Sequence, residues 1–271
     1  MDRLAILAPA LIPAGYMIVM LAVYGARCAA GRPPPVEAFD ARRSSELFGP
    51  FLTRYFYWIL QPILRLGVAW RVRPNTLTFA SLLFAAGAGM AVATGHLATA
   101  GWLYIFAGAL DVLDGRLARV TSSQSRAGAF LDSVGDRWGE LIVLSGFVWY
   151  VRDSAWLAAA LLAIVGSVMV SYTRARGEGV GLRLDKGAMQ RAERIAIVAV
   201  GSLVAAWLEA GAATAGYGVH VLGVALVSTG LGASLTALGR WREGYVRLRR
   251  ADELDAVADE GRGDPPSLRA C

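Results

Sequence analysis

Residues 110–140 read LDVLDGRLARVTSSQSRAGAFLDSVGDRWGE and combine apolar helical segments with a group of acidic residues. This stretch places Asp111, Asp114, Asp132 and Asp136 between two segments that are apolar enough to lie in a lipid bilayer. An ionisable group at the centre of a membrane-spanning helix costs about 2.5–3.5 kcal/mol on insertion scales, so such groups usually serve a function. Four carboxylates so close together need a compensating cation.

The spacing of the aspartates puts each pair on one helix face. Asp111 and Asp114 are three residues apart, and Asp132 and Asp136 are four apart. The helices that carry them, 98–119 and 128–152, are joined by a short turn, so we expect antiparallel neighbours whose aspartates face each other.

Four oxygen donors with no His or Cys nearby favour a hard cation, and the sequence predicts Mg²⁺ or Mn²⁺ bound as two ions. Two divalent ions held close together are typical of phosphoryl transfer. The alternative is a set of ordinary helix-end charges hydrated by water.

The rest of the chain is that of an all-α, polytopic membrane protein. Of its 271 residues, 56% are hydrophobic, and the mean hydropathy is +0.47. A soluble helical protein would need more polar helix faces than its apolar runs offer. The predicted spans are 4–25, 75–96, 98–118, 139–152 (extended backwards by 128–138), 155–173, 195–214 and 217–239. They form a transmembrane helical bundle, a six-span catalytic core with one extra N-terminal span.

Arginine is concentrated in alternate connections, which predicts the orientation of the seven spans. The connections 95–99, 152–154 and 208–220 carry almost no basic residues, whereas those after the first, third, fifth and seventh spans are rich in them. By the positive-inside rule the N-terminus lies outside and the aspartates face the cytoplasm, in the cell (inner) membrane. Contact with anionic membrane lipid also explains the isoelectric point of about 9.7, so we expect no nucleic-acid partner.

Composition shifts divide the chain into four parts. We predict an N-terminal transmembrane helix at 1–28, a cytoplasmic linker and interfacial helix at 29–73, a six-helix domain at 74–240 and a cytoplasmic tail at 241–271 that ends loosely. Pro50 and Pro62 break the interfacial segment 45–70 into short pieces. The lone residues Cys28 and Cys271 imply neither a disulfide framework nor a zinc site.

A family resemblance rests on the aspartates and their neighbours. The pattern Asp111-x-x-Asp114-Gly115-x-x-Ala118-Arg119, followed after eight residues by Gly128-x-x-x-Asp132-x-x-x-Asp136, resembles the full signature of the CDP-alcohol phosphotransferases. The resemblance covers about 70–240 and implies a metal-dependent transferase. It further implies that all four aspartates hold the two metal ions and that Asp136 also acts as general base. The residues that it implies for the CDP-linked donor are Pro74, Asn75, Thr76, Leu77, Gly115, Arg119, Ser125 and Gly128.

The acceptor alcohol is indicated by residues 171–195, which are similar to the corresponding stretch of the phosphatidylinositol-phosphate synthases. Guanidinium groups bind phosphate well, so we expect a phosphorylated acceptor. The arginines in question are Arg137, Arg176, Arg191 and Arg194. The expected reaction transfers the phosphatidyl group of CDP-diacylglycerol to inositol phosphate and releases CMP.

Three alternatives stay open at this stage. Glycerol 3-phosphate could be the acceptor, and the arginines could serve only topology or lipid headgroups. A divalent-cation transporter would also use intramembrane aspartates, but here all four lie at one membrane face and no acidic relay leads to the other. The expected assembly is a homodimer.

Overall fold

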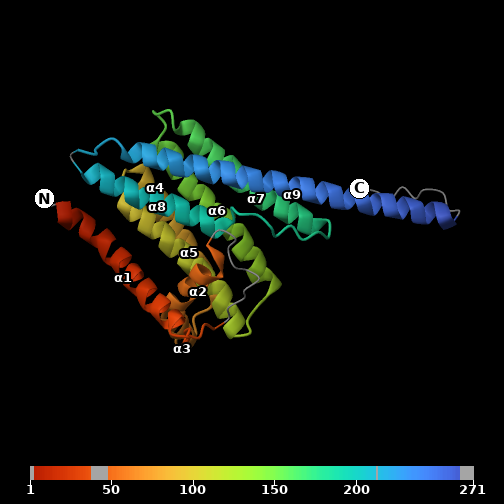
Figure 1. Ribbon diagram of the computed structural model, residues 1–271, viewed down its shortest axis with the longest axis horizontal. Helices are drawn as coiled ribbons and strands as arrows, with labels where there is room; N and C mark the ends of the chain where they lie inside the picture. Colours follow the sequence, from red (N-terminus) through yellow and green to blue (C-terminus); the bar gives the residue numbers. More distant parts are fainter. Residues whose placement is uncertain (1–2, 38–47, 212, 263–271) are drawn as a thin grey trace.

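The computed structural model describes residues 3–37, 48–211 and 213–262, and within these ranges every regular element is a helix (Figure 1). The helices are α1 (Arg3–Ala29), α2 (Gly49–Ile59), α3 (Gln61–Ala69), α4 (Pro74–Ala93), α5 (Leu97–Val120), α6 (Arg126–Tyr150), α7 (Leu157–Gly179), α8 (Arg191–Ala210) and α9 (Gly218–Arg262). The all-α prediction is confirmed. Residues 38–47, which belong to the predicted linker and the start of the interfacial segment, and the end of the tail at 263–271 lie outside the described residues.

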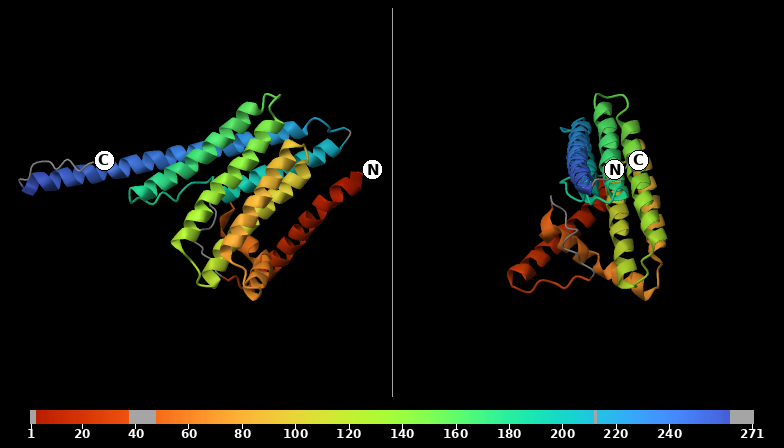
Figure 2. Two further views of the ribbon diagram at one scale, coloured as in Figure 1. Left: turned by 180° about the vertical axis from the view of Figure 1, so that it is seen from behind. Right: turned by 90° about the vertical axis from the view of Figure 1, so that its right-hand side faces the viewer.

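Five of these helices are long and apolar enough to cross a membrane, namely α1, α4, α5, α7 and α9. Helices α6 and α8 carry charged side chains of the candidate site and are not among the five. Both still lie in the same bundle as the other long helices (Figures 1 and 2). The count of seven spans therefore stays a prediction.

Small residues let the helices of the bundle touch along their backbones. A Cβ atom built on Gly146 of α6 would overlap the carbonyl group of Gly89 on α4. A Cβ atom on Gly166 of α7 would lie 2.6 Å from the carbonyl oxygen of Gly230 on α9. Close approach through glycine is a common way for membrane helices to pack when both sides of the contact are apolar. The first crossing holds α6, which carries Asp132 and Asp136, against α4, and the second holds α7 against α9.

Two short helices follow the linker, as the positions of Pro50 and Pro62 predicted. Pro50 and Pro62 each lie in the first turn of a short helix, α2 and α3 respectively, where a missing backbone N–H costs nothing. Helix α1 meets α2 through Tyr24, which is 1% exposed and packs against the rings of Phe51, Tyr55 and Trp58. Figure 1 shows α1 along one side of the bundle, with its C-terminal end at α2 and α3.

Helix α9 continues far past the predicted span at 217–239 and takes in the first part of the predicted tail, as far as Arg262. Ion pairs at i,i+4 spacing, Glu243–Arg247 and Arg249–Glu253, support this extension. Both prolines of the tail, Pro265 and Pro266, come after the end of α9. In Figure 1 the C-terminal half of α9 projects beyond the bundle.

Candidate active site

Three of the four predicted aspartates gather where the end of α5 lies beside the start of α6. Asp111, Asp114 and Asp132 each offer a carboxylate oxygen, and these oxygens all lie within 4.8 Å of one another. Asp114 is 3% exposed, and the other two are partly buried. Three carboxylates that close together repel one another strongly unless a cation lies between them. The donor set therefore fits a divalent metal ion with oxygen ligands.

The fourth aspartate, Asp136, is linked to this group by an arginine. Arg191, the first residue of α8, forms ion pairs through one guanidinium nitrogen with both Asp111 and Asp136, the latter at 2.6 Å. These side chains are about one fifth exposed, so the pairs are partly shielded from water. Arg191 thus places a positive charge beside the carboxylates.

A threonine that the sequence analysis did not select supports Asp114. The hydroxyl of Thr78 donates a hydrogen bond of 2.6 Å to Asp114 Oδ2, and Thr78 is 4% exposed. Thr78 lies one helical turn after Pro74, at the start of α4. The one signal in the sequence is the four-residue spacing between Pro74 and Thr78. This spacing places Thr78 on the same face of α4 as Pro74, which was predicted to contact the donor.

The start of α6 brings together three of the predicted donor-binding residues. Ser125 is the N-cap of α6, and its hydroxyl accepts a hydrogen bond of 3.0 Å from the backbone N–H of Gly128. A Cβ atom on Gly128 would lie 3.5 Å from Asn75 Oδ1. Asn75 follows Pro74, which begins α4. The α4 and α6 N-termini therefore meet, and helix N-termini favour anionic ligands.

The remaining predicted donor residues divide into two kinds. A Cβ atom on Gly115 would lie 3.5 Å from the guanidinium of Arg119, whose buried Nε atom has no hydrogen-bond partner among the described residues. Such a donor is available to a ligand. Thr76 is exposed, but Leu77 packs against the apolar cluster of Leu60, Leu64, Ala109, Leu113 and Leu117, so its role is to hold α4 against α5.

The four predicted acceptor arginines are not equivalent. Only Arg191 contacts the aspartates in the described part of the chain. Arg137 bonds Ser133 one turn earlier in α6, including its hydroxyl at 2.8 Å, and Arg176 is exposed at the end of α7.

Arg194 has a different place from the one predicted, because it is buried against Glu140. Its Nε and Nη2 atoms donate to the two Glu140 carboxylate oxygens at 2.6 and 2.8 Å, and the side chains are 3% and 5% exposed. Because both of these bonds engage the guanidinium of Arg194, its role is to join α8 to α6 beside the aspartates. Glu140 was missed by sequence reasoning, although it continues the four-residue spacing of Asp132 and Asp136 on the same helix face.

Comparison with known proteins identifies the matching region. The family model described as CDP-alcohol phosphatidyltransferase matches residues 71–230. The phosphatidylinositol phosphate synthase of Corynebacterium glutamicum is 34% identical over 149 residues, which cover 53% of this chain and 68% of that protein. The archaetidylinositol phosphate synthase of Methanothermobacter thermautotrophicus is 39% identical over 127 residues, covering 47% of this chain and 64% of that protein.

Solved structures give the same likeness in three dimensions. The phosphatidylinositol phosphate synthase of Mycobacterium tuberculosis, crystallised with CDP-DAG bound, superposes with a TM-score of 0.60 at 26% identity, covering 69% of this chain and 94% of that one. A second crystal structure of that enzyme, in complex with manganese and citrate, also has a TM-score of 0.60, and the likeness covers 68% of this chain and 88% of that one at 26% identity.

Proposed function

This chain belongs to the CDP-alcohol phosphatidyltransferase family, and from that we propose that it transfers the phosphatidyl group of CDP-diacylglycerol to inositol phosphate and releases CMP. It is a phosphotransferase of phospholipid biosynthesis and an integral membrane protein. The observation that carries the proposal is the cluster of Asp111, Asp114 and Asp132, with Asp136 held beside it by Arg191.

The carboxylate cluster supports a divalent metal centre, which we propose holds two ions, Mg²⁺ or Mn²⁺. Asp111, Asp114 and Asp132 would hold them, with Asp136 contributing from the next turn of α6. When bound, the ions neutralise the diphosphate and make its phosphorus more electrophilic. The Thr78 hydroxyl fixes the orientation of the Asp114 carboxylate, as supporting hydrogen bonds to metal ligands commonly do.

Asp136 is the residue that we assign as general base. Its carboxylate takes the proton of the acceptor hydroxyl as that oxygen forms a bond to the lipid-linked phosphorus. The bond between this phosphorus and the bridging oxygen breaks, and CMP leaves with the electron pair. The ion pair with Arg191 keeps the Asp136 carboxylate oriented toward Asp111, so base and cation site stay adjacent.

The donor nucleotide is assigned to the junction of α4, α5 and α6. Polar contacts there come from the N-cap at Ser125, the amide side chain of Asn75 and the Arg119 Nε–H, which has no partner in the described part of the chain. Gly115 and Gly128 leave room for a ligand to approach the backbone. These contacts support a phosphate-rich donor placed against the carboxylate cluster.

For the acceptor phosphate we assign Arg137, Arg176 and Arg191, and we leave Arg194 out because Glu140 occupies it. Arg191 serves twice, because it also contacts Asp111 and Asp136. Arg176 is the clearest test of acceptor binding, since it is exposed and outside the carboxylate cluster.

The deciding experiment is an acceptor screen with purified protein, CDP-diacylglycerol and Mg²⁺, scored by CMP release. We expect turnover with inositol phosphate, little with free inositol or serine, and none when a chelator removes the metal. Preference for glycerol 3-phosphate would overturn the acceptor but keep the transfer reaction. Absence of CMP release with every alcohol would overturn the reaction itself.

Within this screen, Arg176→Ala should raise the KM for inositol phosphate by about tenfold or more, as expected for one lost charge-assisted bond. The KM for CDP-diacylglycerol should stay nearly constant. Arg152→Ala is the matched control, because Arg152 lies at the opposite end of the bundle and contacts Trp149 and Asp153.

We also propose that the carboxylate end of the bundle faces the cytoplasm. In a background without Cys28 and Cys271, cysteines introduced at Ser123 and Gly181 should resist an impermeant thiol reagent in intact cells, and one at Gly216 should react. The reverse labelling pattern would invert the orientation.

A further inference from the structure

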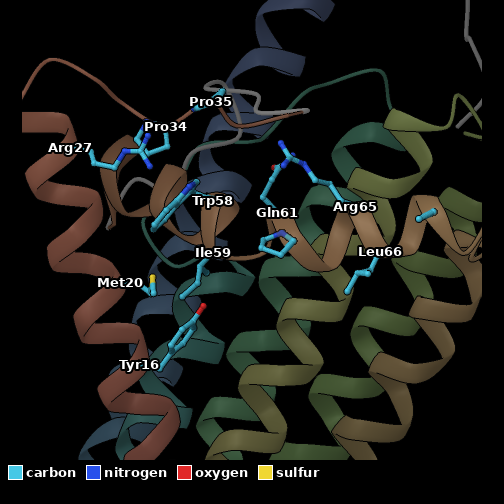
Figure 3. A pocket seen from close by; sticks show the side chains of 12 residues that line it. Tyr16, Met20, Arg27, Pro34, Pro35, Trp58, Ile59, Gln61, Arg65 and Leu66 are labelled. Atoms are coloured by element: carbon cyan, nitrogen blue, oxygen red, sulfur yellow. The ribbon is translucent and has the colours of Figure 1, made fainter.

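A cavity of about 780 Å³ lies between α1 and the two short helices α2 and α3 (Figure 3). This volume is within the roughly 300–1,000 Å³ of small-molecule sites. All of its lining residues fall between Tyr16 and Ala69, whereas the family match begins at residue 71. The cavity is therefore a feature of the N-terminal region and no part of the carboxylate site.

The lining changes from polar to apolar along α1. Figure 3 shows Arg27, Gln61 and Arg65 at one end of the cavity, and Tyr16 and Met20 at the other. The eleven-residue step from Tyr16 to Arg27 corresponds to about 16 Å of helix at roughly 1.5 Å per residue. One leaflet of a hydrocarbon core of about 30 Å has nearly the same depth. The polarity of the cavity thus follows that of a single leaflet.

The polar end of the cavity carries two arginines whose charges are weakly compensated by the described residues. Arg27 is exposed and forms no ion pair within the described ranges. Arg65 pairs with Glu37 at 3.2 Å, but the two side chains are 65% and 46% exposed. A pair so open to water contributes little and is readily exchanged for another anion. An anionic group is therefore the charge that fits this end.

Gln61 supplies an independent sign of a missing ligand. Its side-chain oxygen accepts hydrogen bonds from Arg116, at 2.6 Å, and from the backbone N–H of Glu37, at 3.4 Å. These bonds fix the amide orientation, and Nε2 of this cavity-lining residue is buried and has no partner among the described residues. Gln61 is only 5% exposed, and an unpaired buried donor is unfavourable. A ligand oxygen in the cavity would satisfy it.

We propose that this cavity binds one anionic diacyl phospholipid from the surrounding leaflet. Its phosphate lies between Arg27 and Arg65, one headgroup or ester oxygen accepts from Gln61 Nε2, and an acyl chain lies along Met20 and Tyr16. Helix α1 supports this occupant because it is a candidate membrane span whose sides are largely exposed.

The site is connected to the catalytic region by a short path. Gln61 bonds the guanidinium of Arg116, a fully buried residue of α5 that directly follows Gly115. A lipid that holds Gln61 in place therefore also fixes the α3 end of this contact. The geometry makes the lipid a stabilising ligand of the N-terminal region.

The test is to count phospholipid bound to the purified, delipidated full-length protein by native mass spectrometry. Dioleoylphosphatidylglycerol and the net-neutral dioleoylphosphatidylcholine are added separately. We expect one phosphatidylglycerol per chain, bound at least about tenfold more tightly than phosphatidylcholine, and Arg27→Gln should remove about that preference. Arg32→Gln, which makes the same change on an exposed arginine outside the cavity, should retain it.

Filling the cavity gives the second arm. Met20→Trp should abolish the tight site, whereas Ile18→Trp, on an exposed face of the same helix, should not. Equal retention of the two lipids, equal behaviour of the two arginine variants, or unchanged binding in Met20→Trp would overturn the proposal. The proposal would also be overturned if Arg27→Gln or Met20→Trp raised the KM for CDP-diacylglycerol and left phosphatidylglycerol binding unchanged, because the cavity would then bind the donor.

Discussion

The catalytic region of α4–α8 and the N-terminal region of α1–α3 hold their buried polar groups in opposite ways. In the catalytic region, charges from different helices pair with one another, as Arg194 does with Glu140 and Arg191 with Asp136. In the N-terminal contact, the partners that the described residues offer the buried Arg116 are uncharged oxygens, the backbone carbonyls of Tyr57 and Glu37 and the amide of Gln61.

Because of this difference, the two regions should be sensitive to different substitutions. The catalytic region depends on the sign and number of charges, because a carboxylate cluster needs cations nearby. The N-terminal contact depends on where carbonyl oxygens point, and therefore on the backbone of α2 and the linker. The predictions below run from the largest expected effect to the smallest.

The largest effect is expected for Asp136→Asn. The amide cannot take the proton of the acceptor, and loss of a general base lowers rates by about 10²–10⁴-fold. CMP release measures the effect, and the protein should remain folded in detergent. Asp153→Asn makes the same change at an exposed residue and should leave turnover intact. Appreciable activity in Asp136→Asn would remove the general-base assignment.

The next effect concerns stability and Glu140→Gln. Removing one partner of a buried ion pair costs about 3–5 kcal/mol, because Arg194 would keep an uncompensated charge. Thermal unfolding of the purified protein should show a large drop. Glu178→Gln, in the exposed pair with Arg174, should change stability by at most about 1 kcal/mol.

The double variant Glu140→Met/Arg194→Met sharpens that result. It removes both charges, so it should regain much of the stability lost in Glu140→Gln. A double variant as unstable as the single one would mean that packing, rather than charge, explains this contact.

A smaller effect is expected for Arg116→Met, which tests the N-terminal contact. It removes the guanidinium donor from the backbone oxygens of Tyr57 and Glu37 and from the side-chain oxygen of Gln61, at a cost of about 1–3 kcal/mol for a buried group that loses its partner. Limited proteolysis within residues 29–48 should become faster than in the parent protein. Equal cleavage in both would show that Tyr24 and its ring contacts alone hold the N-terminal region.

The smallest effect is expected for Glu37→Gln. This change removes the exposed pair with Arg65 but keeps the backbone contacts of Glu37, so stability should change by at most about 1 kcal/mol. With Glu37 uncharged, Arg65 is freer to bind a phosphate, and phosphatidylglycerol retention should be equal or higher. A clear loss of retention would mean that Glu37 itself orients Arg65 for the lipid.

Some of this molecule is determined by sequence alone, because local spacing fixes local geometry. The three- and four-residue spacing of the aspartates places each pair on one face of a helix whatever the rest of the chain does. Pro50 and Pro62 likewise mark the first turns of α2 and α3, since a ring without an N–H fits there. The extension of α9 to Arg262 was not predicted, because the apolar run that marks the last span ends near 239 and the residues after it are charged.

Other features were decided only by the tertiary structure, because they need partners that are distant in the chain. Arg194 and Glu140 are 54 residues apart, and nothing local in either segment distinguishes a buried ion pair from a phosphate-binding arginine. Thr78 reaches Asp114 from another helix, 36 residues away. Arg116 occupies a variable position of the motif, and only the packing of α2 and α3 against α5 gives it acceptors. Spacing shows which side chains share a helix face, but only packing decides which faces meet.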